Sequence, residues 1–314
     1  MKLQAKIDLV KLLTNTVFIY PDEFYVSLLD NEVYNFEVMD ITSFPLIQAV
    51  GKGSDMMSKP AVLAFNYIPD PNHKYDAIVI GKGVIYDTGG LDIKTGRGMY
   101  GMHTDKAGAA AVAAVLGDKN RHSNILGLVG IVENSIGPRS IRPGEVVRTA
   151  TGKTVEITNT DAEGRLVMGD ILDNLSLITP VSLLNEVPIF TIATLTGSMK
   201  SCLGSQYAGI LSTNSSVPGW AIKYSEKYKV WPLPWNSSLE DGHKSFRNAD
   251  LANYNYNRSE KLDHIQAFMF LKEFLPKDYN NYTHIDIAGM ATDKYWNSTG
   301  YGVELLDKLI RSIH

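Results

Sequence analysis

This chain has a single cysteine, a small net charge and no long apolar run, and each of these features excludes some classes of function. The single cysteine, Cys202, cannot form an intrachain disulfide or a zinc site built from several thiolates, and it is most simply a small core residue. A formal net charge of -4 provides no general attraction for nucleic acid or an anionic membrane surface. No run of residues is long and apolar enough to span a bilayer, and charged residues interrupt the N-terminus before a signal-peptide core could form. We therefore expect a cytoplasmic protein with neither nucleic-acid nor membrane partners.

The remaining composition is that of an ordinary globular protein. Of the 314 residues, 44% are hydrophobic, which is enough for one large core or two smaller ones. Apolar patterning predicts helices over residues 4–13, 21–30, 107–116, 166–178, 265–275 and 303–313. It predicts strands over residues 61–67, 76–81, 124–132, 155–158, 188–193 and 285–288. This alternation is typical of an α/β fold, which we expect to be a three-layer α/β/α domain whose central, mostly parallel sheet has helices on both faces.

Several residues with possible functional roles follow the predicted strands. Lys82, Asp161, Thr194 and Ala288 each come at, or just after, the carboxyl end of a strand. Open α/β sheets build their binding sites at that edge, so these strand ends are expected to converge on one crevice.

Four carboxylates lie in the segments around these positions: Asp87, Asp105, Asp161 and Glu163. Brought into one pocket, they would repel one another and take up protons unless cations compensated them. Two divalent ions match that charge, and carboxylate oxygens suit zinc, manganese, magnesium or cobalt. A pair of such ions, about 3.5 to 4 Å apart, is a common arrangement for metal-assisted hydrolysis.

The segment around Asp161 predicts a local geometry. In an extended turn, Asp161 and Glu163 would point to the same side, so that both could reach one metal pair. Gly164 would then let the chain turn sharply before a helix that starts near Arg165.

Lys82 and Lys94 each allow two interpretations. As a metal ligand, Lys82 must be neutral, with a pKa depressed by burial and by the metal charge. A salt bridge to the carboxylates is the alternative, and spacing alone favours it because lysine is an uncommon ligand. Lys94 could remain charged and stabilise an oxyanion, or lie in solvent on the surface. His103 lies close to Asp105, but the seven histidines show no ligand-like spacing, which favours a non-ligand role.

Two motifs resemble those of a known family. Residues 159–166, Asn-Thr-Asp-Ala-Glu-Gly-Arg-Leu, resemble the signature of the leucine (cytosol) aminopeptidases, which are dinuclear metallo-exopeptidases. Residues 81–90, Gly-Lys-Gly-Val-Ile-Tyr-Asp-Thr-Gly-Gly, followed by Lys94 and Asp105, are similar in order and spacing to the first metal motif of that family. The resemblance covers essentially the whole chain.

The resemblance implies a role for each of these residues. One metal would be bound by Lys82, Asp87, Asp105 and Glu163, with Lys82 as a neutral amine, and the other by Asp87, Asp161 and Glu163. Lys94 would polarise the scissile carbonyl, and Arg165 would hold a bicarbonate ion that acts as general base. The substrate pocket would be lined by Met102, Asn159, Thr194, Leu195, Gly197 and Ala288.

The activity implied by the resemblance is removal of the N-terminal residue, leucine or another apolar one, from peptides with a free N-terminus by a metal-bridging hydroxide. The cofactors would be two divalent ions per chain, zinc or manganese with magnesium or cobalt as alternatives, and the assembly a homo-hexamer. Residues 1–314 would form a single catalytic domain, without the N-terminal domain that is usual in the family. The alternative is a catalytically impaired member that serves as a metal-binding or structural assembly protein.

Two residues depart from the family pattern. Lys106 follows Asp105 where many members have Met or Cys, so that a cation adjoins a proposed metal ligand. Ala291 stands where some members have a larger apolar residue, which predicts a roomier pocket for the N-terminal side chain of the substrate.

Overall fold

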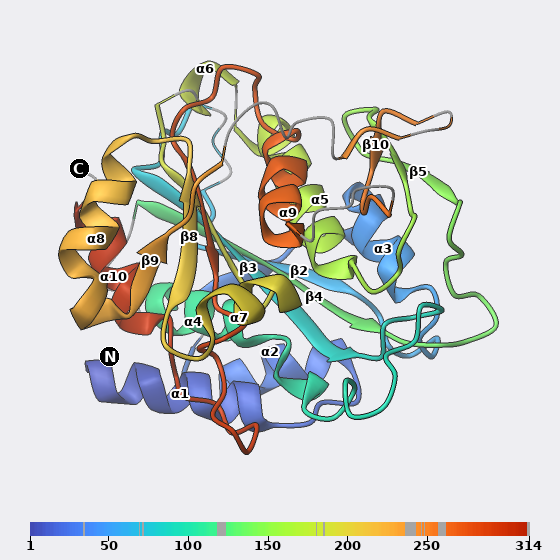
Figure 1. The fold of residues 1–314 in the computed structure, drawn as a ribbon, viewed down its shortest axis with the longest axis horizontal. Helices are drawn as coiled ribbons and strands as arrows, with labels where there is room; N and C mark the ends of the chain where they lie inside the picture. Colours follow the sequence, from blue (N-terminus) through green and yellow to red (C-terminus); the bar gives the residue numbers. More distant parts are fainter. Residues whose placement is uncertain are drawn as a thin grey trace.

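The computed structural model describes residues 1–314 apart from 34, 69, 71, 118–123, 180, 185, 236–242, 246, 248, 257–261 and 313–314. Its centre is an eight-stranded sheet in the order β1-β2-β4-β3-β7-β11-β8-β9 (Figure 1). The strands are β1 (Phe36–Val38), β2 (Ala61–Phe65), β3 (Ala77–Asp87), β4 (Ile125–Asn134), β7 (Ile189–Ala193), β8 (Ala208–Ser212), β9 (Val230–Pro232) and β11 (Tyr282–Asp286). The middle strands β4, β3, β7 and β11 run parallel, whereas β2 pairs antiparallel with β1 and β4, and β8 with β11.

A second, three-stranded sheet lies outside this core. It consists of β10 (Leu251–Ala252), β6 (Thr154–Glu156) and β5 (Val146–Arg148) in that order. β6 comes shortly before the 159–166 motif in the sequence, and β10 pairs with β6 in parallel. The small sheet therefore holds the chain around residue 252 next to the segment that leads to the 159–166 motif.

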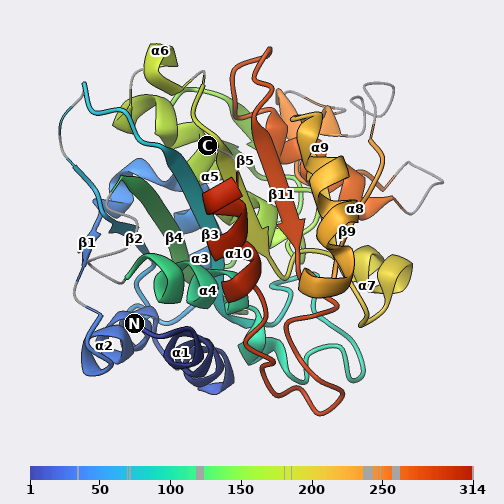
Figure 2. The same ribbon diagram turned by 90° about the vertical axis from the view of Figure 1, so that its left-hand side faces the viewer.

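Helices cover both faces of the large sheet, which confirms the predicted three-layer arrangement (Figure 2). Buried side chains of one hydrophobic cluster come from α1 (Leu3–Asn15), α2 (Pro21–Asp30), α4 (Ala107–Leu116), α8 (Ser216–Tyr228) and α10 (Val303–Ser312). Those of the other come from α3 (Pro45–Gly51), α5 (Glu163–Ile178), α6 (Val181–Leu184), α7 (Gly197–Leu203) and α9 (Asp263–Lys272). Within the described part of the chain, no helix combines the length and the apolar character needed to cross a membrane.

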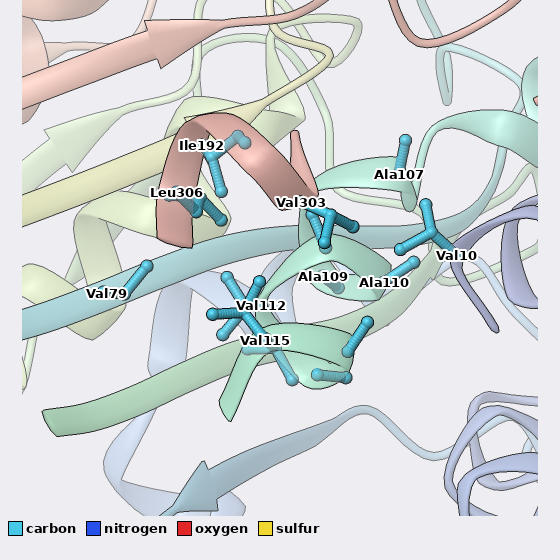
Figure 3. Packing of buried hydrophobic residues seen from close by; sticks show 14 of the residues in the cluster. Val10, Val79, Ala107, Ala109, Ala110, Val112, Val115, Ile192, Val303 and Leu306 are labelled. Atoms are coloured by element: carbon cyan, nitrogen blue, oxygen red, sulfur yellow. The ribbon is translucent and has the colours of Figure 1, made fainter. Parts of the chain in front are cut away.

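The alanine-rich helix α4 packs directly on the sheet, as its thin side chains predict. All ten of its residues are buried, and Figure 3 shows Ala109 and Val112 packed among Val79 of β3 and Val303 of α10. A Cβ on Gly108 of α4 would lie 2.2 Å from the carbonyl oxygen of Ile192 in β7. Only glycine allows this approach, so the backbone of α4 sits against the backbone of the sheet.

Three details differ from the sequence-based expectations. β3 continues to Asp87 instead of ending near residue 81, so that Lys82 lies inside the strand. The helix expected to start near Arg165 begins earlier, at Glu163. Cys202, expected in the core, is exposed, because it lies on the short surface helix α7, where Met199 is the buried residue.

Candidate metal centre

A cavity opens at the carboxyl edge of the parallel strands. β3 ends at Asp87, β7 ends just before Thr194, and β11 ends shortly before Ala288. The cavity has a volume of about 380 Å³. It brings together every residue that the sequence assigned to a site: Lys82, Asp87, Lys94, Met102, Asp105, Asn159, Asp161, Glu163, Arg165, Thr194, Leu195, Gly197 and Ala288. The convergence expected from the strand ends is therefore present, although the roles of the individual residues are a separate question.

Lys82 lies between two of the carboxylates. Its Nζ is 2.7 Å from Oδ2 of Asp105 and 2.8 Å from Oε1 of Glu163, and it donates a 3.0 Å hydrogen bond to the carbonyl oxygen of Thr194. Burial favours the neutral amine, but Asp105 and Glu163 hold the pKa of Lys82 above its ordinary value. This is the salt-bridge arrangement that spacing favoured. The same nitrogen could bind a metal only if cations took over the charge of the carboxylates and Lys82 released its proton.

Lys94 bridges the other two carboxylates. Its Nζ is 2.8 Å from Oδ2 of Asp87 and also donates a hydrogen bond to Oδ1 of Asp161. Burial opposes the charge, yet Asp87 and the neighbouring acids raise the pKa of Lys94, so the side chain stays an ammonium. Gly89 and Gly90, with φ of +88° and +65°, bend the chain between β3 and Lys94. Lys94 therefore points into the cavity and not into solvent on the surface.

Neighbouring side chains fix the orientation of the carboxylates. Asn134, at the end of β4, donates a 2.8 Å hydrogen bond to Oδ1 of Asp87 and a 3.1 Å bond to the carbonyl oxygen of Thr160. The hydroxyl of Thr194 donates a 2.6 Å hydrogen bond to Oδ1 of Asp105. Asp87 and Asp105 are thus oriented by neutral side chains as well as by the lysines, which is the support a metal site needs from its surroundings.

The turn that carries the acidic signature is not extended as expected. Ala162 has φ of -105° and ψ of 41°, and Glu163 is already the first residue of α5. One carboxylate oxygen from each of Asp87, Asp161 and Glu163 nevertheless lies within 4.8 Å of the other two. The helix start, and not strand alternation, brings the two acids of the signature to the same side.

Gly164 has a different role from the sharp turn expected of it. It lies in the first turn of α5, where an added Cβ would be 2.6 Å from Cε and 2.7 Å from Nζ of Lys82. These separations are well below the roughly 3.5–4.0 Å of ordinary carbon contacts. The glycine provides the space that Lys82 occupies.

The charges of the cavity fit a pair of divalent cations. The two ammonium groups offset only half of the charge of the four carboxylates. Burial accordingly raises the pKa of Asp105 to about 8 and that of Asp161 to about 7, while Lys82 and Lys94 lower the pKa of Glu163 against the effect of its burial. Among the described residues, Oε2 of Glu163 has no hydrogen-bond partner. A hard cation satisfies such an oxygen and supplies the missing positive charge.

Arg165 forms an ion pair that the sequence did not reveal. Its Nη2 is 2.5 Å from Oδ1 of Asp263, the first residue of α9, and its Nη1 donates a 3.0 Å hydrogen bond to the carbonyl oxygen of Asn253. The ring of Tyr254 lies 5.6 Å from the guanidinium carbon. Arg165, Tyr254 and Asp263 all line the cavity. The guanidinium therefore already has a carboxylate partner within the chain.

Lys106 points away from the carboxylates despite its place beside Asp105. It is fully buried, and its Nζ donates hydrogen bonds to the carbonyl oxygens of Thr14, Thr16 and His103. Phe18 adds a cation–π contact at 5.0 Å. Burial lowers the pKa of Lys106 to about 7. Lys106 thus joins the end of α1 to the segment before α4, which explains a lysine at this position without a part in the metal centre.

The wall of the cavity beyond the carboxylates includes residues that the sequence did not single out. Trp296 and Lys200 line it together with Ala291, and Nζ of Lys200 lies 5.1 Å from the Trp296 ring. The indole packs on Gly101, where a Cβ would be 2.3 Å from the ring. Because Gly101 immediately precedes Met102, this contact defines the position of a predicted pocket residue.

Sequence reasoning missed Asn134, Asn253, Asp263 and Trp296. The strand-end rule could have found Asn134, which terminates the strand next to β3. Asn253 forms hydrogen bonds with the backbone of Thr158 and Asn159, and it directly follows β10, a two-residue strand too short to carry a pattern. Asp263 and Trp296 stand beside no motif, so no local signal links them to the site.

Comparison with known proteins adds an independent line of evidence. The catalytic domain of the cytosol aminopeptidase family matches residues 20–307. A probable cytosol aminopeptidase of Cereibacter sphaeroides is 36% identical over 91% of this chain and 58% of its own length, and the cytosol aminopeptidase of Rickettsia prowazekii is 36% identical over 83% and 53%. The chain spans about half the length of these curated relatives. Among solved structures, the bottromycin maturation enzyme BotP in complex with Mn aligns with a TM-score of 0.84 and 26% identity over 99% of this chain and 70% of the other.

The fold and the cavity thus define an α/β/α protein with an acidic, lysine-containing centre at its sheet edge. The chain belongs to the cytosol aminopeptidase family, and the match covers that family's catalytic domain. The resemblance stated from the two motifs is therefore confirmed.

Proposed function

We propose that this chain is the catalytic part of a dinuclear metal-dependent aminopeptidase. The observation that carries the proposal is the approach of Asp87, Asp161 and Glu163 to within 4.8 Å of one another, with two lysines in contact with the same acidic cluster. The proposed ligands of one cation are Lys82, Asp87, Asp105 and Glu163, and those of the other are Asp87, Asp161 and Glu163. When bound, the two cations would supply the Lewis acidity that makes water a nucleophile near neutral pH.

The residues of the chain would position the substrate and stabilise charge. Lys94 stays charged in contact with Asp87 and Asp161, where its ammonium could stabilise the oxyanion that develops on the scissile carbonyl. The free α-amine of a peptide would bind at the metal centre that the acidic cluster holds. An internal peptide bond offers no such amine, so the reaction would be restricted to the amino end.

The substrate pocket is proposed from the remaining cavity residues: Met102, Asn159, Thr194, Leu195, Gly197 and Ala288. Leucine or another apolar residue would be the preferred N-terminal side chain, and the small Ala291 would leave room for larger ones. Zinc or manganese is proposed as the metal, because carboxylates and an amine accept both.

Further features remain proposals supported by the family alone. They are a cytosolic location, a homo-hexamer, and a single catalytic domain over residues 1–314. The family resemblance also implies a bicarbonate at Arg165, where it would have to share the guanidinium with Asp263.

Hydrolysis of Leu-p-nitroanilide by protein stripped of metal and reloaded with manganese, zinc, cobalt or magnesium tests the function. The wild type is expected to bind about two cations per chain and to release p-nitroaniline, because two of them match the charge of the acids. Lys94→Ala is expected to retain the metal and lose activity by about 10²-fold or more. Asp161→Ala is expected to lose one cation.

A protein that binds two cations but hydrolyses no aminoacyl substrate would contradict the proposal. That outcome would instead support the alternative of a catalytically impaired member with a metal-binding or structural role. Mass spectrometry of the metal content distinguishes a metal-bound but inactive protein from a preparation that is inactive because it lacks metal.

A further inference from the structure

We propose that Asp263 supplies, from within the chain, the carboxylate that the family resemblance assigns to a bicarbonate ion on Arg165. The inference rests on the proposed aminopeptidase function and adds a residue to its machinery. Asp263 lies 98 residues from Arg165 in the sequence and reaches it from the start of α9. Hydrolysis by this chain would then need no exogenous anion.

The first argument is the occupancy of the guanidinium. Nη2 of Arg165 binds Oδ1 of Asp263 at 2.5 Å, and Nη1 binds the carbonyl oxygen of Asn253 at 3.0 Å. The ring of Tyr254 stands 5.6 Å from the guanidinium carbon. A bicarbonate would have to displace or share the Asp263 carboxylate to bind the paired Nη atoms in the usual two-bond geometry.

The second argument is charge. Asp263 forms an ion pair with Arg165. A further anion would therefore approach a neutral pair and not an unpaired arginine. The field that would attract bicarbonate to an unpaired arginine is absent at this pair.

The third argument is access. The side chain of Arg165 is 3% exposed, whereas that of Asp263 is 22% exposed, and both line the cavity. The carboxylate is the more exposed group of the pair, so a water molecule or substrate in the cavity reaches it more readily than the guanidinium.

We therefore expect Asp263 to accept and then release the proton that moves during hydrolysis. As the water oxygen forms its bond to the carbonyl carbon, a proton of that water passes to the Asp263 carboxylate. As the carbon–nitrogen bond breaks, the same proton passes to the leaving amine. Asp263 ends as a carboxylate, and one water has been consumed for each peptide bond.

The experiment compares the wild type, Asp263→Ala and Asp263→Asn in buffers stripped of carbon dioxide, with and without added bicarbonate. We expect wild-type kcat/KM to be independent of bicarbonate. Both variants are expected to lose about 10²-fold or more without it, the range for a missing general base. Added bicarbonate is expected to restore Asp263→Ala, where the site on Arg165 is vacated. It is not expected to restore Asp263→Asn, where the amide still fills that site.

Binding of ¹³C-bicarbonate, followed by NMR line broadening, gives a readout that does not depend on activity. Saturable binding is expected for Asp263→Ala and not for the wild type. Asp278→Ala, which removes an exposed carboxylate outside the cavity lining, is the matched control. Asp263→Asn keeps a hydrogen-bond acceptor for Arg165, so it tests the idea even if Asp263→Ala does not fold.

Three results would overturn the inference: wild-type activity that collapses without bicarbonate, saturable bicarbonate binding by the wild type, or an Asp263→Asn variant as active as the wild type. If the wild type hydrolyses no substrate under any condition, the proposed function fails. The bicarbonate-binding measurement still decides which anion Arg165 holds.

Discussion

Replacing Gly164 with alanine is expected to damage the metal centre while changing the stability of the fold only modestly. The new Cβ would lie 2.6 Å from Cε, 2.7 Å from Nζ and 2.8 Å from Cδ of Lys82. Ordinary contacts need roughly 3.5 Å or more, so the lysine must move by about 1 Å. Lys82 is buried and held by Asp105, Glu163 and a backbone carbonyl, so any such movement breaks contacts with its partners.

The two effects on stability oppose each other. Overpacking costs about 1–3 kcal/mol, whereas alanine in place of glycine in a helix stabilises by about 1 kcal/mol. The net loss in the free energy of unfolding is therefore expected to be about 0–2 kcal/mol. A misplacement of about 1 Å at a reactive centre can cost about 10²-fold, and we expect a loss of that order in kcat/KM.

Gly169→Ala is the matched control for this prediction. It lies in the same helix, and its Cβ would meet the ring of Phe274 at 2.7 Å, so it overpacks the core away from Lys82. Metal affinity by isothermal titration calorimetry and unfolding by urea should separate the two variants. If Gly164→Ala binds two cations as tightly as Gly169→Ala and hydrolyses substrate as fast, the reasoning about Lys82 is wrong.

Three further predictions concern the acids, Lys106 and the pocket. Because the pKa of Asp105 is raised to about 8 and that of Asp161 to about 7, these acids carry protons below those values, and cation binding must release them. Manganese affinity should therefore fall from pH 8 to pH 6, and titration calorimetry in two buffers of different ionisation enthalpy should show proton release; binding without it would contradict the pKa shifts. Lys106→Met should lower the free energy of unfolding by about 1–3 kcal/mol, because it leaves buried carbonyl oxygens without a donor, and should leave the metal content unchanged in mass spectrometry. Ala291→Met should reduce kcat/KM for Phe-p-nitroanilide relative to the leucine substrate by about tenfold, and an unchanged ratio would show that Ala291 does not limit the pocket.

Much of the large sheet and its covering helices could be predicted from the sequence because their apolar runs are long. The apolar run before Lys82 can only be read as a strand, and the alanine-rich segment 107–116 can only be read as a thin helix. β8, a buried run of five residues, was missed because so short a segment has no period that separates strand from helix.

The metal centre was predictable for a different reason. Asp161 and Glu163 lie in the 159–166 signature, and the strand-end rule placed Asp161 at the same edge of the sheet as Lys82, although Lys82 lies inside β3. Lys94 and Asp105 follow no predicted strand and were identified through the upstream motif that begins at Gly81. The pairing of Arg165 with Asp263 was not predictable, because it depends on how α9 packs beside α5. Gly164 was wrongly predicted to be a turn residue. Glycine is needed there because the side chain of Lys82, which comes from a strand distant in the sequence, occupies the space of a Cβ.

The close main-chain contact between α4 and the large sheet limits which amino-acid substitutions this protein can accept. At Gly81 and Gly108 the main chains touch, and a Cβ on either would meet a carbonyl oxygen at 2.8 Å and 2.2 Å. Side chains can change rotamer to absorb a substitution, but a main-chain contact has no such freedom. In a saturation mutagenesis screen, these two glycines should tolerate change as poorly as the proposed ligands, although neither lines the cavity. Positions that do not tolerate mutation would therefore include the glycines that support α4 and Asp105, as well as the proposed metal ligands.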